Sequence, residues 1–473
     1  MTTTITTTKN GASFLLVLFL LVVSCTGWEQ CSEEAGGGIC PDRATCCPTT
    51  TRGVSGCISA KAKDPSGMAR CCDDRSTGCG YGYTCAKEEN DDESNQGHNS
   101  LFCKLQDNSD HDPENFDSPR YQLCSVPTKY QKLHGFPMMT EEDNTNRFRL
   151  AYYSNMDSVT VPQNRHLRVE TVLIMIHGSA RNADDYFCAA LSVVALDNKN
   201  KKNATNSDTV LVLAPKFAAP EDEPSLDNAL VWVDHDENIP LSHTWRYGAD
   251  AMNAPISSFA ALDSLVEYLV QAKVQYPNLR RIVVAGHSAG GQITQRWALL
   301  SNSPAWETID VRAVVANPRS YSYLDGRRIA ADGTTFEVPD EDDIAFCEDY
   351  NKWTWGLEPG GRLVCPYKDN ALKITPADTM TERYATRKVI YLAGEHDTIS
   401  LFDACETSNF QGENRNERAK NFVQGLKEYF GRPVHALHIV PGSPHDHSLM
   451  FQSEAGQRAI FGDDKFKGSE RNF

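Results

Sequence analysis

After residue 23 the sequence contains no apolar run long enough to cross a bilayer, and basic residues are few relative to acidic ones. The 46 lysines and arginines are outnumbered by 63 aspartates and glutamates, which gives a formal net charge of −17. This balance argues against nucleic acid as a partner and against binding to an anionic membrane surface. A chain of 473 residues with this composition has room for two or three globular domains.

The one long apolar run lies near the start of the chain, at Phe14–Val23, after Lys9 and before several small residues. This arrangement predicts that residues 1–27 are a secretory signal peptide, so that the mature protein is extracellular and has no membrane span. Two alternatives are an uncleaved signal anchor and lipid attachment at Cys25. The sequon that begins at Asn203 is consistent with a secreted glycoprotein.

Cysteine is concentrated in one part of the chain, since 11 of the 16 cysteines lie between Cys31 and Cys124. Residues 28–86 are poor in large aliphatic side chains, so cross-links must hold this segment together in place of a packed core. Export and the absence of a Cys-x-x-Cys pair favour disulfides over a metal cluster. If Cys25 leaves with the signal peptide, the remaining odd number requires a free thiol or an intermolecular bond.

The vicinal pairs Cys46-Cys47 and Cys71-Cys72 show a resemblance to the granulin module. That resemblance implies small hairpins stacked on a ladder of disulfides in residues 28–86. The pattern departs from the family at Cys57 and Cys79, which are single where the family has doublets. The next segment, 87–125, is acidic and polar, and its composition is typical of a linker, with Cys103 and Cys124 able to tie its ends.

From residue 126 to 473, short β-branched runs alternate with helical patterns, which predicts an open, mostly parallel α/β sheet covered by helices on both faces. Helices are expected over Pro255–Val270, capped by Ser257 or Ser258, and over Arg418–Phe430, ended by Gly431. The predicted strands are Val169–Ile176, Thr209–Ala214, Arg281–Ala285, Val311–Ala316, Lys388–Ala393 and Ala436–Val440.

The strand at Arg281–Ala285 runs into Gly286-His287-Ser288-Ala289-Gly290, and a helical pattern follows. This is the G-x-S-x-G motif in the strand–turn–helix setting of a nucleophile elbow. The turn is tight, so glycines at both flanks are required. The motif predicts Ser288 as a nucleophile, whereas the alternative is a glycine-rich turn with an incidental serine.

A serine hydroxyl needs a base and a group that orients that base, and both are expected after later strands, in the order acid then histidine. Asp397 follows the strand at Lys388–Ala393 and is the predicted acid, with Glu395 and Asp403 as less well-placed alternatives. His445 follows the last strand and is the predicted base. His447 competes with it, and a His-x-His pair could instead bind a metal, but no third ligand is evident.

The oxyanion formed by such an attack needs two backbone amides. One is expected from Ala289, directly after the nucleophile. The other is assigned to Ser179, because His177-Gly178 after the strand at Val169–Ile176 is similar to the His-Gly loop of lipases and esterases.

Residues 126–473 thus resemble the secreted α/β-hydrolases of the serine esterase, lipase and polyester depolymerase group. The resemblance implies the α/β-hydrolase fold and cleavage of carboxylic esters through an acyl-enzyme intermediate, without a metal or cofactor. The ester substrate is a small molecule, a lipid or a polymer, and the oligomeric state stays open. Two other hypotheses are a serine peptidase on the same fold and a catalytically silent, cystine-rich interaction protein.

The strand pattern lapses over 319–386, where an insert rich in tyrosine and tryptophan is expected to cap the active site. Its aromatic side chains either line a substrate cleft or form a satellite core under a long loop. Cys347, Cys365 and Cys405 are expected to staple the insert to the body, and Cys188 is interpreted as a buried thiol on a helix.

Overall fold

The computed structural model describes residues 130–139, 147–200, 207–222, 226–233, 244–400, 405 and 410–462, together with six short strands between residues 28 and 105. The chain divides into two compact units, residues 1–121 and 122–473. The predicted signal peptide, the sequon at Asn203 and the alternative acid Asp403 lie outside the described residues.

The first unit contains three antiparallel strand pairs. The strand β6 lies inside the segment 87–125, which was predicted to be a linker. Its pairing with β5 shows that strand structure continues beyond residue 86. The cross-links of the granulin-like prediction lie outside the described residues. The pairs are β1 (Trp28–Gln30) with β2 (Ile39–Pro41), β3 (Ala44–Cys47) with β4 (Gly56–Ser59), and β5 (Tyr83–Lys87) with β6 (Leu101–Leu105).

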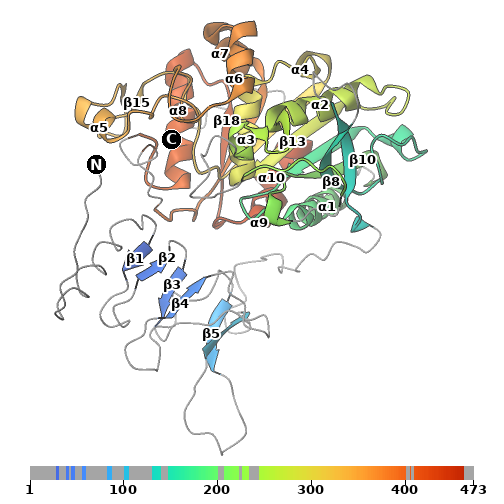
Figure 1. The fold of residues 1–473 in the computed structure, drawn as a ribbon, viewed down its shortest axis with the longest axis horizontal. Helices are drawn as coiled ribbons and strands as arrows, with labels where there is room; N and C mark the ends of the chain where they lie inside the picture. The colour runs from blue at the N-terminus through green and yellow to red at the C-terminus, as the bar shows by residue number, and fades with distance from the viewer. Residues whose placement is uncertain are drawn as a thin grey trace, which may run out of the picture. The chain divides into compact units, whose positions relative to one another are not determined.

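The second unit is built on one eight-stranded sheet, in the order β18-β17-β14-β13-β9-β10-β8-β7 (Figure 1). The parallel part of the sheet consists of β9, β10, β13, β14, β17 and β18, whereas β8 is antiparallel to both of its neighbours. The strands are β7 (His134–Met138), β8 (Phe148–Ser154), β9 (Thr171–Ile176), β10 (Val210–Lys216), β13 (Arg281–His287), β14 (Asp310–Ala316), β17 (Lys388–Gly394) and β18 (Ala436–Val440).

Numbered along the chain, the strands of this sheet lie side by side in the order 1-2-4-3-5-6-7-8. This order, with an antiparallel second strand and a serine turn after the fifth, is the α/β-hydrolase fold and confirms the predicted fold class. All six predicted strands are present. The sequence reading missed β7 and β8 at one edge, because Pro137 interrupts β7 and the apolar run of β8 is short, at residues 150–153.

Helices cover both faces of the sheet and enclose two apolar clusters. The helices α1 (Ala183–Asn200), α9 (His447–Gln452) and α10 (Glu454–Phe461) pack on one face, and α1 and α9 lie side by side (Figure 1). The larger cluster lies on the other face, where α2 (Ser258–Gln271), α3 (Ala289–Leu300) and α8 (Arg415–Phe430) bury their apolar sides.

The predicted helix signals agree with the structure. Ser257 caps α2, since its hydroxyl accepts a hydrogen bond from the amide of Phe259. Gly431 ends α8 in a left-handed conformation with φ of 65°. The remaining short elements are β11 (Asp250–Ala251), β12 (Ala254–Ser257), α4 (Ala305–Thr308), β15 (Arg328–Ile329), β16 (Phe336–Glu337), α5 (Glu341–Phe346), α6 (Pro366–Ile374) and α7 (Ala377–Thr386).

Several aromatic residues of the insert belong to the core. Tyr321, Trp353 and Trp355 are buried and join the larger apolar cluster, so the interpretation as a packed core is confirmed for them and the open cleft is not. A disulfide between Cys347 and Cys405 ties the insert to the chain ahead of α8, whereas Cys365 is a free, buried thiol.

The interpretation of Cys188 as a buried thiol is wrong. Cys188 is buried on α1 but is disulfide-bonded, and its partner lies outside the described residues. Apolar neighbours such as Phe187 surround a thiol and a half-cystine alike, so the local sequence did not distinguish them.

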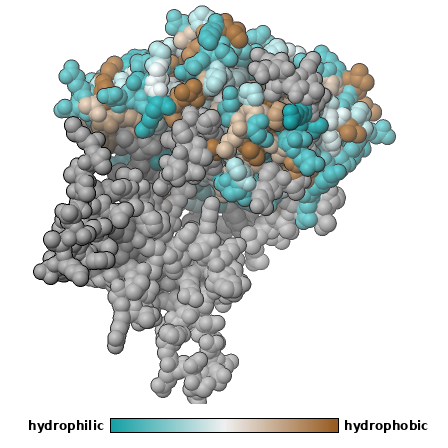
Figure 2. All heavy atoms as spheres, in the orientation of Figure 1, coloured by the Kyte–Doolittle hydropathy of each residue, from teal (hydrophilic) through white to brown (hydrophobic). Residues whose placement is uncertain are grey.

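The visible surface of the second unit is mostly polar, with apolar side chains scattered in small groups (Figure 2). None of the helices in the described part of the chain has the length and apolar character needed to cross a membrane.

Candidate active site

The nucleophile elbow is formed where β13 passes directly into α3. Ser288 has φ of 58° and ψ of −118°, a conformation that side chains other than glycine rarely adopt. Its amide donates to the carbonyl of Ala316 at 3.0 Å, and its carbonyl accepts from Gln292 at 3.0 Å. Both contacts hold the strained turn between the sheet and the helix, and Ser288 itself is partly exposed.

The glycines of the motif are required by contact distance. A Cβ on Gly286 would lie 2.1 Å from the carbonyl oxygen of Gly290, and a Cβ on Gly290 would lie 2.3 Å from that of Ile176. Gly291 is also crowded, because a Cβ there would lie 2.7 Å from the carbonyl oxygen of Ala316. The three glycines therefore let α3 approach the sheet closely enough for the turn to form.

Replacement of Ser288 by glycine is expected to make the chain more stable than replacement by alanine, by about 1 kcal/mol. Both variants lack the hydroxyl, but only glycine adopts a positive φ without strain, and the gain exceeds its greater entropy loss on folding. Urea denaturation of the two variants measures the difference. Equal midpoints would show that the elbow stores no strain at this residue.

The predicted acid and base meet at the same edge of the sheet, because β17 and β18 are adjacent parallel strands. The imidazole Nδ1 of His445 lies 2.6 Å from Oδ2 of Asp397. The Asp397 side chain is fully buried and the His445 side chain is 28% exposed. A carboxylate only accepts hydrogen bonds, so Nδ1 of His445 carries the proton and Nε2 is left as the basic nitrogen.

The environment of His445 keeps its imidazole neutral. Burial lowers the pKa of His445, and the nearby Arg415 charge lowers it further, while the hydrogen bond to Asp397 raises it. The net pKa lies below the ordinary histidine value. The imidazole is therefore able to accept a proton at neutral pH, as a general base must.

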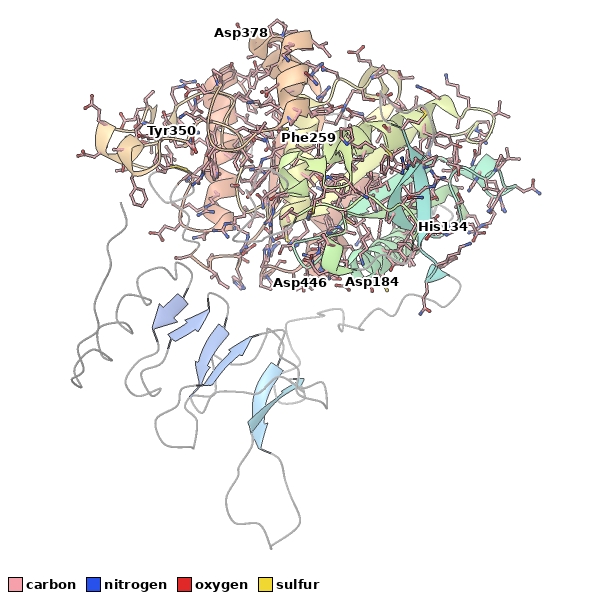
Figure 3. All side chains as sticks on the ribbon, viewed as in Figure 1. His134, Asp184, Phe259, Tyr350, Asp378 and Asp446 are labelled. Atoms are coloured by element: carbon pink, nitrogen blue, oxygen red, sulfur yellow. A yellow bond between two sulfur atoms is a disulfide. The ribbon has the colours of Figure 1, made fainter. Side chains whose placement is uncertain are left out.

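The alternative residues occupy other positions. His447 begins α9, stacks on Tyr186 with ring centroids 4.0 Å apart, and its Nε2 lies 3.4 Å from the carboxylate of Asp185. Glu395 is exposed and accepts a hydrogen bond from the amide of Gly442. Neither residue is part of the Asp397–His445 pair. Figure 3 labels Asp446, which caps α9, and Asp184 on α1, where these two helices meet.

The predicted oxyanion loop lies beside the nucleophile. A Cβ on Gly178 would lie 3.6 Å from Cβ of Ser288 and 2.8 Å from the Tyr186 hydroxyl oxygen, so this position has room only for glycine. Within the described residues, the amides of Ser179 and Ala289 donate to no backbone carbonyl. Ala289 directly follows the nucleophile, and Ser179 follows Gly178 in this loop.

His177 fixes the shape of this loop. The amide of Phe217 donates to its Nε2 at 3.0 Å, so Nδ1 carries the proton and donates to the carbonyl of Gly178 at 2.8 Å. The ring is fully buried and packs edge-on against Trp245. The histidine of the His-Gly pair therefore has a structural role, in holding the backbone of residue 178.

The structure adds groups that the sequence reasoning missed. His287, inside the serine motif, is buried with its ring 4.5 Å from that of His445, and it hydrogen-bonds to the Tyr186 hydroxyl at 3.1 Å. Burial lowers the pKa of His287 far below its usual range, so this ring is neutral as well. Arg415, at the start of α8, places Nη1 3.3 Å from Oδ1 of Asp397.

Asn317 joins the ends of three strands near this site. Its side-chain oxygen accepts from the amide of Gly394 at 2.8 Å, and its side-chain nitrogen lies 3.4 Å from Nε2 of His287. Its φ of 43° is in the left-handed region that asparagine tolerates. A polar residue directly after the apolar strand β14 was the signal available in the sequence.

Among the described residues, no group of three or more histidine, cysteine, aspartate or glutamate side chains could hold a metal ion. The His445-x-His447 pair points its two rings to different carboxylates, Asp397 and Asp185.

No protein-family model matches the chain, and no curated protein matches its sequence. Several solved structures are distantly similar. Poly(aspartic acid) hydrolase-1 from Sphingomonas sp. KT-1 is 19% identical, with a TM-score of 0.42, over 69% of this chain and 98% of that one. LpqC, a poly(3-hydroxybutyrate) depolymerase from Bordetella parapertussis, is 19% identical, with a TM-score of 0.43, over 70% and 91%.

The ferulic acid esterase AmCE1/Fae1A from the anaerobic fungus Anaeromyces mucronatus is 12% identical, with a TM-score of 0.33, and the match covers 72% of this chain and 96% of that one. At such distances the fold assignment rests on the strand order and the serine elbow of this chain.

Proposed function

We propose that this chain is a secreted serine hydrolase that cleaves carboxylic esters through an acyl-enzyme intermediate. Ser288 is the nucleophile, His445 the general base and Asp397 the group that orients the base. The observation that carries the proposal is the 2.6 Å contact between Asp397 and His445, formed at the strand edge that also presents the strained serine turn. A carboxylate, an imidazole and a serine in this order are the components of a proton relay.

In the acylation step, Oγ of Ser288 forms a bond to the ester carbonyl carbon while its proton moves to Nε2 of His445. The carbonyl π electrons move to the oxygen, and the amides of Ser179 and Ala289 bind the resulting anion. When the C=O bond reforms, the alkoxide leaves and takes the proton from His445. The products of this half-reaction are a free alcohol and an acyl ester on Ser288.

Deacylation repeats the same steps with water. His445 accepts a proton from the water molecule as its oxygen attacks the acyl carbon, and the proton then passes to Oγ of Ser288 as the acid leaves. The proposal needs no metal or organic cofactor, because each proton and electron pair is accounted for by these residues.

The disulfides support export of the chain. Cys347 and Cys405 are bonded to each other, and Cys188 is also in a disulfide. Disulfides persist in oxidising compartments and are rare in the cytosol. The predicted signal peptide and the cysteine-rich first unit favour the same compartment.

The proposal is tested with a fluorophosphonate probe on the purified full-length chain. We expect a single covalent adduct on Ser288, found by mass spectrometry of the digest, and no adduct in Ser288→Ala. Circular dichroism of both proteins serves as the folding control. A folded wild-type chain that takes no label would favour the catalytically silent alternative.

A substrate panel then separates the two hydrolase hypotheses. Nitrophenyl esters of increasing acyl length and peptide nitroanilides share a chromogenic readout, so their kcat/KM values are directly comparable. We expect turnover of the esters and none of the anilides. Preferential cleavage of the anilides would identify a peptidase instead.

A further inference from the structure

Arg415 occupies a position that is electrostatically unfavourable by itself. It is the first residue of α8, whose preceding residue, Asn414, caps the helix through its side chain. Helix amino termini carry partial positive charge, so a cation in the first turn is destabilising unless an anion compensates it. The Arg415 side chain is only 14% exposed, and its Nη1 lies 3.3 Å from Oδ1 of Asp397, which supplies the anion.

The start of α8 also holds the backbone of the Asp397 loop. The amide of Asn416 donates to the carbonyl of Asp397 at 3.2 Å, and its side-chain nitrogen donates to the carbonyl of Gly394 at 2.8 Å. The loop is therefore held through main chain and side chain by two consecutive residues. The two oxygens of Asp397 are divided between Arg415 and His445, which leaves the carboxylate little freedom to rotate.

We infer that Arg415 is a positioning residue of the active site: it anchors one oxygen of Asp397 so that the other faces His445, and its charge opposes protonation of the imidazole. The inference rests on the proposed function for its catalytic meaning. The geometric part, a guanidinium behind the acid of the pair, stands on the contacts alone.

The charges that surround His445 indicate the direction of the effect. Burial is the largest cause of its lowered pKa, and the Arg415 charge lowers the pKa further. The carboxylates of Asp397 and Asp446 raise it. The other titratable neighbours are His287 from the elbow and His447 from α9, and burial lowers the pKa of each. Arg415 therefore contributes a permanent positive charge that acts on the base, and we expect its removal to raise the His445 pKa.

The test measures the titration of His445 directly, in the full-length chain. Histidine is labelled with ¹³C at Cε1, and the His445 signal is assigned by its loss in His445→Asn. We expect the pKa of His445 to rise by about one unit in Arg415→Gln, the scale of one charge a few ångströms away in a partly buried site. Arg415→Lys keeps the charge and should stay near the wild-type value.

Two further variants keep the result interpretable. Arg415→Met retains the apolar stem of the side chain, so it reports on the charge if Arg415→Gln folds poorly. Arg280→Gln is the matched control, because Arg280 is an exposed cation paired with Glu170 next to the amino end of β13, the opposite end from the elbow. An unchanged His445 pKa in folded Arg415→Gln or Arg415→Met overturns the inference.

Kinetics with a nitrophenyl ester complete the test. The acidic limb of the kcat/KM profile should move up in pH with the measured pKa, with kcat lowered and KM little changed, because Arg415 has no assigned contact with substrate. A residue needed only for stability would lower the unfolding midpoint without moving this limb. If the chain has no esterase activity, the nuclear magnetic resonance shift still decides whether the Arg415 charge acts on His445, so the two proposals fail separately.

Discussion

Replacing His445 with alanine is expected to lower kcat for an ester by roughly a million-fold, the scale seen when the base of a serine hydrolase is removed. The reason is geometric, since His445 contacts Asp397 and His447 does not. Without the imidazole, the Ser288 hydroxyl keeps its proton and is a poor nucleophile. The measurement is kcat from initial rates with a nitrophenyl ester, with the enzyme concentration taken from the protein mass.

The matched control for this prediction lies two residues further on. His447→Ala removes an imidazole that stacks on Tyr186, so it should disturb packing next to the site and cause a far smaller loss of kcat. If His447→Ala caused the large loss and His445→Ala the small one, the assignment of the base would be reversed.

Replacing Asp397 with asparagine is expected to lower kcat by about 10⁴-fold while leaving the fold intact. An amide nitrogen facing His445 donates a hydrogen bond where the carboxylate accepts one. Nδ1 then becomes the acceptor, the proton moves to Nε2, and Nε2, the proton acceptor of the proposed mechanism, no longer has a free lone pair. The substitution therefore acts by changing the tautomer of His445. We expect a lower kcat and an unchanged circular dichroism spectrum.

Glu395→Gln is the control for Asp397→Asn, because it makes the same chemical change two residues away. Glu395 is exposed and accepts from the amide of Gly442, so its loss should alter a loop contact and leave the rate near the wild-type value. A large fall in Glu395→Gln with an active Asp397→Asn would identify Glu395 as the acid.

The central strands β9, β13 and β14 could be predicted from the sequence because each contains an apolar run that is buried on both faces of the sheet. The loops after these strands then carry the candidate residues, since parallel strands end at one edge of the sheet. The outer strands β7 and β8 were not predicted, because Pro137 interrupts β7, the apolar run of β8 is short, and both strands are defined by pairing with the rest of the sheet.

The surroundings of the site depend on distant contacts that one sequence does not show. An insert rich in aromatic residues is equally compatible with a substrate cleft and with a packed core. Only the packing in the structure shows that Trp353 and Trp355 are buried. Arg415 lies 18 positions after Asp397, and nothing near it in the sequence indicates that the two side chains meet.

The unfavourable backbone of Ser288 has a consequence for laboratory evolution of this chain. Selection of a library only for thermal stability or expression yield favours glycine at position 288. The selected variants would be stable but would lack the proposed nucleophile. Sorting that also demands turnover, or a library in which this codon is held fixed, retains the hydroxyl while the rest of the scaffold improves.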